Sequence, residues 1–318
     1  MKNILEIKDL NISFKLESQI AKAIHGISLQ LERAKSLGIV GESGCGKSVT
    51  AMSVMRLLPS NAVIESGEIL WKEKNILGFS EKEMQQIRGN QIALIPQDPM
   101  TSLNPLYTVG EQIHEVIALH QKVSKKEAKE IAIESLKNVK IPEADKRYND
   151  YPHQFSGGMR QRAIIAMSLS CNPELIIADE PTTALDVTVQ AQILNLIKSV
   201  QEERGTSLLL ITHDLGIVAE TCNNVAVLYA GRIVEYADVM SIFKNPLHPY
   251  TQGLLESLPV KNSQKLKAIK GQPPAISDNI SGCPFYPRCG HRIELCKNVS
   301  PELITVSENH RVSCHLYN

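Results

Sequence analysis

The sequence lacks an excess charge of either sign, a long apolar run and the form of a signal peptide. Its 34 Lys and Arg residues are balanced by 34 Asp and Glu residues. This balance argues against general electrostatic attraction to nucleic acid or to a membrane surface, but it leaves room for docking onto a membrane protein through a local patch. No apolar run approaches the roughly 18 residues that a spanning helix needs, and Glu6 interrupts the apolar stretch near the N-terminus. We therefore expect a cytosolic chain.

The 318 residues, of which 43% are apolar, are enough for two modest domains or for one domain with an appendage. Disulfides are rare in the cytosol, so the seven cysteines need another explanation. Four of them fall in the last 36 residues, which suggests a metal site there. These four are Cys283, Cys289, Cys296 and Cys314.

Residues 41–48 read GESGCGKS, which is the pattern G-x-x-x-x-G-K-S. The pattern follows the apolar run 37–40 and precedes a helical pattern, the context that a phosphate-binding loop requires. Lys47 would reach the β- and γ-phosphates of a nucleotide, and Ser48 would place its hydroxyl on Mg²⁺. We expect Cys45 to be a small filler residue rather than a reactive thiol. The residues expected to contact the nucleotide are Gly41, Ser43, Gly44, Cys45, Gly46, Lys47, Ser48 and Val49.

Apolar periodicity predicts an α/β core. Alternation over residues 5–8 and 24–31 predicts strands of an N-terminal β-rich segment. The short apolar runs 91–95, 175–178 and 208–211 predict buried strands, and the last two suit a central parallel sheet. Apolar stripes from about residue 108 predict inserted helices, one of them capped by Ser124 with Glu127 three residues later. Residues 225–236 read as a hairpin that turns at Gly231.

Two carboxylates follow the predicted strand 175–178. Asp179, at the strand end, is the expected second ligand of a Mg²⁺ ion. Glu180 beside it could polarise an attacking water as a general base. The alternative is that both are strand-end residues in solvent.

Residues 155–162 read FSGGMRQR and lie upstream of that strand. Ser156 can cap a helix, and Gly157 and Gly158 permit an anion to approach the backbone closely. Because this stretch lies between a phosphate loop and a strand that ends in Asp-Glu, it is a specific signal for one family of ATPases. The chain resembles the ATP-binding-cassette (ABC) ATPases, and residues 156–161 are similar to their signature motif.

The resemblance implies roles for further residues. Gln97 matches the glutamine-loop residue that contacts Mg²⁺ and the attacking water, and His213 matches the switch histidine near the γ-phosphate. Phe14 stands where the family more often has a Tyr that stacks on adenine, and a core Phe is the alternative. Residues 184–186 match the D-loop, which crosses between paired cassettes. The family mechanism implied is that two subunits sandwich each ATP, with Ser156, Gly157 and Gly158 of one facing the γ-phosphate held by the other.

Four stretches narrow the resemblance to one subfamily. Residues 41–50 (GESGCGKSVT), 97–105 (QDPMTSLNP), 248–255 (HPYTQGLL) and 271–274 (GQPP) resemble the ATPases of dipeptide, oligopeptide and nickel importers. The resemblance implies ATP hydrolysis that powers peptide import, at the cytoplasmic face of the cell membrane. The implied partners are a second, paralogous ATPase subunit, two transmembrane permeases and an extracytoplasmic binding protein, with no nucleic acid. Nickel or metal-chelate import is the alternative, and a soluble non-transport ABC ATPase is a distant one.

The resemblance also bears on the cysteines, because relatives in this subfamily carry the pattern with a 4Fe–4S cluster. Four thiolates could hold such a cluster or, as the alternative, Zn²⁺. His291, His310 and His315 are alternative ligands, but we expect them to be exposed to solvent. The fold class expected is an ABC nucleotide-binding domain over residues 1–245, with a helical subdomain at about 98–173. A Cys-rich extension is expected over residues 246–318.

Overall fold

The computed structural model describes residues 2–17, 19–183, 185–258, 268–278 and 280–317. The chain divides into two compact units. The first comprises Met1–Gly78 and Leu210–Asn318, and the second comprises Phe79–Leu209. Strand β8 (Ser207–Thr212) runs across the boundary. This division does not test the predicted domain limits at residues 98, 173 and 245, which stay predictions.

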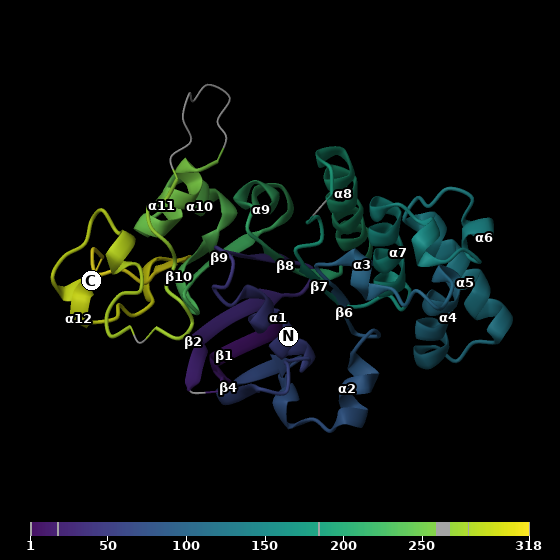
Figure 1. Cartoon of the computed structure of the whole chain (residues 1–318), viewed down its shortest axis with the longest axis horizontal. Coiled ribbons are helices and arrows are strands. Elements are labelled where there is room, and N and C mark those ends of the chain that lie inside the picture. Colours follow the sequence, from purple (N-terminus) through teal and green to yellow (C-terminus); the bar gives the residue numbers. More distant parts are fainter. Residues whose placement is uncertain (1, 18, 184, 259–267, 279, 318) are drawn as a thin grey trace. The chain divides into compact units, whose positions relative to one another are not determined.

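The N-terminal part of the first unit is an antiparallel sheet, in the segment where the sequence predicts strands. Its strand order is β2-β1-β4-β5 (Figure 1). β1 pairs with β2 on one side and with β4 on the other, and Ile7 of β1 faces both Leu29 and Ile69. The sequence analysis missed β4. The strands are β1 (Asn3–Lys15), β2 (Ile20–Glu32), β4 (Ala62–Trp71) and β5 (Lys74–Asn75).

The other strands of the first unit follow the order β3-β9-β10-β12-β11. β3 is buried along its whole length and pairs in parallel with β9, so it feeds the phosphate loop from inside the sheet. β9 and β10 form the predicted hairpin at Gly231, and β12 joins the free edge of β10. The strands are β3 (Ser36–Val40), β9 (Asn224–Tyr229), β10 (Arg232–Asp238), β11 (Ile304–Ser307) and β12 (His310–Val312).

Short helices connect these strands. The first follows the phosphate loop, the second follows β5, and the others lie in the second half of the chain (Figure 1). They are α1 (Lys47–Met55), η1 (Ile76–Gly78), α9 (Leu215–Thr221), α10 (Val239–Lys244), α11 (Pro249–Glu256), η3 (Tyr286–Arg288) and α12 (Leu295–Asn298).

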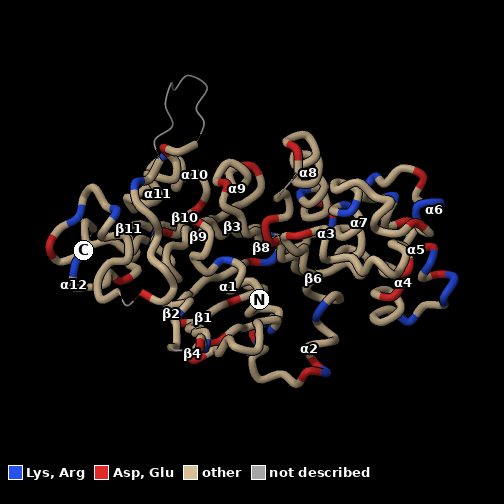
Figure 2. The backbone as a smooth tube through the Cα atoms, viewed as in Figure 1, with Lys and Arg blue, Asp and Glu red and all other residues tan. Residues whose placement is uncertain are grey.

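The second unit is mainly helical and contains the parallel pair β6 (Ile92–Ile95) and β7 (Leu175–Asp179). The predicted cap of α5 is confirmed, since Ser124 and Glu127 bond each other's backbone N–H groups. Figure 2 shows Lys and Arg mixed with Asp and Glu over α4, α5 and α6. The helices are α2 (Glu81–Ile87), α3 (Pro99–Ser102), α4 (Val109–His120), α5 (Lys125–Asn138), α6 (Ala144–Arg147), η2 (Pro152–Gln154), α7 (Gly157–Leu169) and α8 (Val187–Arg204).

Candidate functional site

The predicted phosphate loop lies between β3 and α1 in the first unit. Gly44 and Gly46 adopt left-handed φ angles of 79° and 105°, which favour glycine. A Cβ on Gly46 would lie 2.6 Å from Ile24, whereas a Cβ on Gly44 would meet nothing within 4 Å. Gly46 also caps α1 without a side-chain hydrogen bond. The loop can therefore present backbone N–H groups to an anion at the start of a helix.

Lys47 is held across this loop. Its side chain is 5% exposed, and its Nζ donates hydrogen bonds to the carbonyl oxygens of Gly41 (2.8 Å) and Glu42 (3.1 Å). Ser48, the next residue, is half-buried in the first turn of α1. The ammonium and the backbone N–H groups of the loop can thus donate hydrogen bonds to the phosphates of a nucleotide. The Ser48 hydroxyl oxygen can serve as a ligand of a Mg²⁺ ion.

A backbone hydrogen bond between Gly231 and Cys45 also fixes the loop. The Gly231 N–H donates to the Cys45 carbonyl at 2.9 Å, which ties the loop to the turn of the β9–β10 hairpin. Burial raises the pKa of the Cys45 thiol, so this group stays protonated at neutral pH. The thiol lies in the core, which supports the prediction of a filler residue.

Two further predicted residues belong to the first unit. Phe14 is half-buried near the end of β1 and pairs with Ala21 and Ala62, so part of its ring remains accessible. His213 directly follows β8 and is exposed, and Asp214 caps α9 by accepting from the N–H of Gly216 at 2.7 Å. The turn after β8 is therefore held by its own cap, which leaves the imidazole at the surface.

The second unit brings Gln97 and Glu180 together, although they are 83 positions apart in sequence. Glu180 Oε2 accepts from Gln97 Nε2 at 3.0 Å and from the Thr183 hydroxyl at 2.9 Å. Glu180 has a positive φ of 45°, a strained conformation for a residue with a Cβ. Asp179, the last residue of β7, is 3% exposed. The two carboxylates are thus placed differently: one is buried at the strand end, and the other is held by two donors.

The predicted signature stretch begins α7. The Ser156 hydroxyl accepts from the Met159 N–H at 3.3 Å, so this serine caps the helix as predicted. A Cβ on Gly158 would lie 3.0 Å from Val189 of α8, whereas a Cβ on Gly157 would meet nothing. Gly158 therefore allows close helix packing, and Gly157 leaves the exposed helix start without a side chain.

The predicted D-loop is described only in part, because Ala184 lies outside the described residues. Asp186 caps α8 by accepting from the N–H of Val189 at 2.9 Å. This cap explains why an aspartate suits that position, whatever else the loop contacts.

The four tail cysteines all lie in the C-terminal part of the first unit. The Cys283 N–H donates to the Cys296 carbonyl at 2.8 Å. Burial raises the pKa of Cys283 to about 11, and the other three thiols add to the shift. Within the described residues, no group of three or more His, Cys, Asp or Glu side chains is arranged to hold a metal ion. The described geometry therefore does not support the expected cluster or zinc ion.

One histidine of the tail is not where we expected it. His310 is 5% exposed, and its Nε2 lies 2.7 Å from Oε1 of the fully buried Glu235. The expectation that it faces solvent is wrong, because β12 pairs with β10 and carries this ring into the core. His291 is exposed, and the His315 ring bonds the Val299 carbonyl at 2.9 Å.

His248 is a second buried histidine, at the cap of α11. Its Nδ1 accepts from the Tyr250 N–H at 3.0 Å, and burial lowers its pKa to about 3. An unfolded chain protonates this imidazole near pH 6.5. Protonation therefore favours the unfolded chain below that pH, and the stability contributed by the neutral ring declines as the pH falls toward 3.

The comparisons with known proteins agree with these motifs. A family model for "ABC transporter" matches residues 24–183. A second model, "Oligopeptide/dipeptide transporter, C-terminal region", matches residues 234–296. The chain is 48% identical to the dipeptide transport ATP-binding protein DppD of Bacillus subtilis, which covers 99% of this chain and 95% of that protein. It is 50% identical to the oligopeptide transport ATP-binding protein OppD of the same species, covering 98% and 88%.

The chain belongs to the ABC transporter ATPase family. As a member of that family it is an ATP-hydrolysing enzyme. A solved structure of the ATP-binding cassette MJ0796, a dimer in a post-hydrolysis state bound to ADP and phosphate, matches with a TM-score of 0.67 and 27% identity, over 74% of this chain and 98% of that one. CbiO1 of Clostridium perfringens matches with a TM-score of 0.66 and 28% identity, over 77% and 92%. The predicted ABC ATPase fold is confirmed, and the Cys-rich extension stays a prediction.

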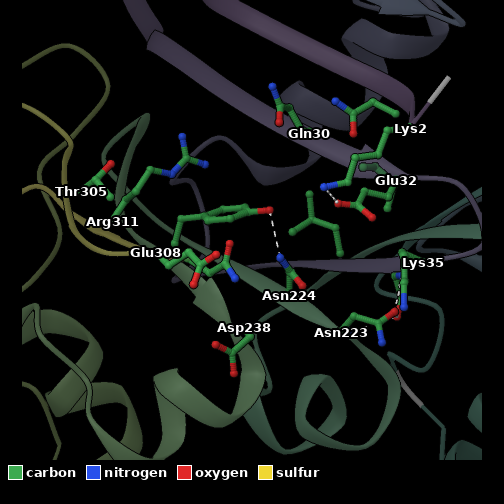
Figure 3. A pocket seen from close by; sticks show the side chains of 16 residues that line it. Lys2, Gln30, Glu32, Lys35, Asn223, Asn224, Asp238, Thr305, Glu308 and Arg311 are labelled. Carbon is green, nitrogen blue, oxygen red and sulfur yellow. Dashed lines mark hydrogen bonds and ion pairs between the residues drawn. The ribbon is translucent and has the colours of Figure 1, made fainter.

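No helix in the described part of this ABC ATPase is both long and apolar enough to cross a membrane. A polar pocket of about 410 Å³ opens in the first unit, among β1, β2, β10 and the β11–β12 hairpin (Figure 3). Its side chains bond one another: Lys2 pairs with Glu32 at 3.0 Å, and Asn224 donates to the Tyr236 hydroxyl at 3.2 Å. It contains none of the predicted site residues, so it is not the nucleotide site.

Proposed function

We propose that this chain is the ATP-hydrolysing subunit that powers binding-protein-dependent import of dipeptides or oligopeptides. The observation that carries the proposal is the likeness to peptide-transport ATPases along nearly the whole chain, including the C-terminal region. The donor set of the phosphate loop and the Gln97–Glu180 pair support hydrolysis as the source of work.

In this proposal the first unit holds the nucleotide. The loop N–H groups and Lys47 bind the β- and γ-phosphates, and Phe14 stacks on the adenine. His213 contacts the γ-phosphate. Lys47 exchanges its bonds to the loop carbonyls for bonds to phosphate oxygens, which an ammonium with three donors can do without moving the backbone. Ser48 supplies one hydroxyl ligand for Mg²⁺, an ion that would neutralise phosphate charge when bound.

The groups that we propose to act on water lie in the second unit. Glu180 is the general base, and its two donors, Gln97 and Thr183, hold the carboxylate in one orientation. Asp179 and Gln97 would be further ligands of a Mg²⁺ ion when it is bound. The start of α7, with Ser156, Gly157 and Gly158, faces the γ-phosphate of the partner subunit. The exposed, uncovered helix start supports that contact.

Replacing Glu180 by Gln tests the proposed base. The amide keeps the shape of the side chain but cannot take a proton. We expect ATP hydrolysis to fall by about 10²–10⁴-fold while ATP binding is retained. Steady-state phosphate release and equilibrium binding of a fluorescent ATP analogue measure the two effects, and Glu220→Gln, at an exposed position of α9, is the matched control. Hydrolysis at the parent rate in Glu180→Gln would remove Glu180 from the mechanism.

We propose that residues 98–107 dock onto a transmembrane permease. Three apolar side chains in this segment are strongly exposed: Met100 (62%), Leu106 (80%) and Tyr107 (55%). Exposed apolar groups that lie close together indicate an interaction site. Leu106→Glu should therefore reduce co-purification with the permeases while the purified chain keeps its ATPase activity. Leu119→Glu, at an equally exposed position of α4, is the control (70%). Undiminished co-purification of Leu106→Glu would exclude this segment.

The remaining partners follow from the same proposal. A second ATPase subunit, a paralogue of this chain, completes each nucleotide sandwich. Two permeases and an extracytoplasmic binding protein complete the transporter, so this chain works at the cytoplasmic face of the membrane. Pull-down from solubilised membranes, followed by mass spectrometry, tests the composition. Recovery of the chain with no permease would contradict it.

A subsidiary proposal concerns Cys283, Cys289, Cys296 and Cys314. Their close spacing in one small extension supports a 4Fe–4S cluster, with Zn²⁺ as the alternative, although the described side chains would have to rearrange to bind either. Anaerobic purification tests it. Broad visible absorbance with stoichiometric iron is expected, and a colourless protein without iron would contradict the cluster.

A further inference from the structure

The C-terminal part of the chain makes direct bonds to the phosphate loop, through Glu42. This residue is the second of the loop, between Gly41 and Ser43, and all the groups involved lie in the first unit. Its N–H, its carbonyl and its carboxylate are all hydrogen-bonded to other residues, and the partners of the N–H and of the carboxylate come from residues beyond 245.

The strongest of these bonds is an ion pair with Arg288 of η3. The guanidinium donates from both terminal nitrogens, at 2.6 Å to Oε2 and at 2.9 Å to Oε1 of Glu42. The arginine side chain is only 4% exposed, and the Glu42 side chain is 28% exposed. Two parallel bonds between a planar guanidinium and a carboxylate fix both position and orientation. This pair is therefore unlike a solvated surface ion pair, which contributes little.

Arg288 is itself held in place. Its Nε donates to the Lys270 carbonyl at 3.1 Å, and its guanidinium lies 5.8 Å from the ring centre of Tyr229 and 5.9 Å from that of Phe285. Phe285 packs edge-on against Tyr229 at 5.3 Å. The arginine thus approaches Glu42 from a packed aromatic cluster rather than as a free side chain.

Tyr250 of α11 holds the backbone of the same residue. Its hydroxyl accepts from the Glu42 N–H at 2.9 Å, and its ring is completely buried and packs against both Tyr229 and Phe285. The third partner is Lys47, whose Nζ donates to the Glu42 carbonyl. A shift of Glu42 would therefore alter one of the two contacts that hold Lys47 across the loop.

We propose that Arg288 and Tyr250 are positioning residues for ATP binding, which hold Glu42 and thereby keep the phosphate loop in its binding conformation. A loop that is already ordered loses less conformational entropy when it binds a ligand. The C-terminal extension is then part of the nucleotide site in function, although neither side chain touches the nucleotide. This inference rests on the proposed function only in that the loop binds ATP.

The experiment measures binding of a fluorescent ATP analogue, mant-ATP, to the full chain. Arg288→Met should weaken binding about tenfold, because it removes both bonds to the carboxylate, and Arg288→Lys should recover part of the loss. Tyr250→Phe retains the packed ring, removes one bond to the loop and should weaken binding about threefold. Arg292→Met is the matched control, since Arg292 is an exposed arginine of the same extension that stacks on Tyr286.

Two further readouts separate positioning from a general loss of folding. In ATPase assays the KM for ATP should rise about tenfold in Arg288→Met, while kcat changes less than twofold. Glu42→Gln combined with Arg288→Met should be no weaker than Arg288→Met alone, because both changes break the same contact. Affinities within twofold of the parent for both Arg288→Met and Tyr250→Phe would overturn the inference, as would an equal loss in Arg292→Met. Failure of the parent chain to bind mant-ATP would instead overturn the proposed function.

Discussion

Replacing Glu235 by Ala should release the β11–β12 hairpin from β10 while the rest of the first unit stays folded. The Glu235 side chain is completely buried, and its two oxygens accept three hydrogen bonds. The donors are the N–H groups of Leu247 (2.7 Å) and His248 (2.9 Å) and the His310 ring (2.7 Å). One carboxylate therefore joins the chain before α11 to the hairpin that lies between Cys296 and Cys314.

The expected magnitude follows from these three donors. A buried donor without an acceptor costs about 1–3 kcal/mol, which sets an upper range of about 3–9 kcal/mol for three. Water reaches the donors once the hairpin opens, so we expect the value typical of a broken buried charged network, about 3–5 kcal/mol. Glu235→Gln retains one oxygen as an acceptor and should cost about 1–3 kcal/mol.

Hydrogen exchange is the suitable assay because it reports local opening. The amide of Ser313 donates to the Val234 carbonyl at 2.8 Å, and Val312 pairs with Glu235 in the sheet. A loss of about 3–5 kcal/mol should speed exchange at these amides by at least about 10²-fold, at 1.36 kcal/mol for each factor of ten. Glu308→Gln, at the exposed turn of the same hairpin, is the control. Exchange within threefold of the parent in Glu235→Ala would refute the reasoning.

Three more perturbations test local features of the two units. The parent chain should lose stability between about pH 6.5 and 5, because the buried His248 imidazole has to remain neutral in the folded state. In His248→Asn this loss should be smaller by about 2 kcal/mol. Melting temperatures over a pH series measure the difference. Gly231→Ala should weaken ATP binding at least tenfold, because its φ is 73° and the new Cβ would lie 2.2 Å from the Ala23 carbonyl oxygen; Gly290→Ala, which meets nothing within 4 Å, is the tolerated control. Ser156→Ala should destabilise the start of α7 by about 1 kcal/mol, seen as faster amide exchange in its first turn.

Each of these three predictions can be contradicted by a specific result. An unchanged pH dependence in His248→Asn would show that the imidazole is not kept neutral by burial. Equal ATP affinities in Gly231→Ala and Gly290→Ala would show that the hairpin turn does not support the loop. Unchanged exchange at the start of α7 in Ser156→Ala would remove the cap as a stabilising feature.

The sequence predicted the features that depend on near neighbours. The glycine spacing of residues 41–48 after an apolar run predicts both the loop and the start of α1, because the geometry is local. The same holds for Ser124 and Ser156, whose capping partners lie three residues away. The hydrogen bond between Gln97 and Glu180 was not predicted, since nothing in their spacing joins them and the resemblance implied only that Gln97 contacts Mg²⁺ and the attacking water.

Features set by distant partners were not predicted. Glu42 and Arg288 are 246 positions apart, and no periodic pattern links a loop carboxylate to an arginine among cysteines. The only sequence signal nearby was the stretch 248–255, which contains Tyr250 but implied no role for it. Glu235 is polar in a β-strand, where alternation suggests an outward side chain, so its burial follows only from the pairing of β12 with β10. β4 was missed because its Glu, Ser and Gly residues weaken the strand pattern.

The most direct test of the account is peptide uptake by the assembled transporter with Lys47→Ala in this chain. The substitution removes the ammonium that lies across the phosphate loop and leaves the surfaces proposed to contact the permease and the partner unchanged. The account predicts a transporter that assembles normally and accumulates no labelled peptide above the level of cells without this subunit. Uptake at the parent rate with the variant chain in place would contradict it.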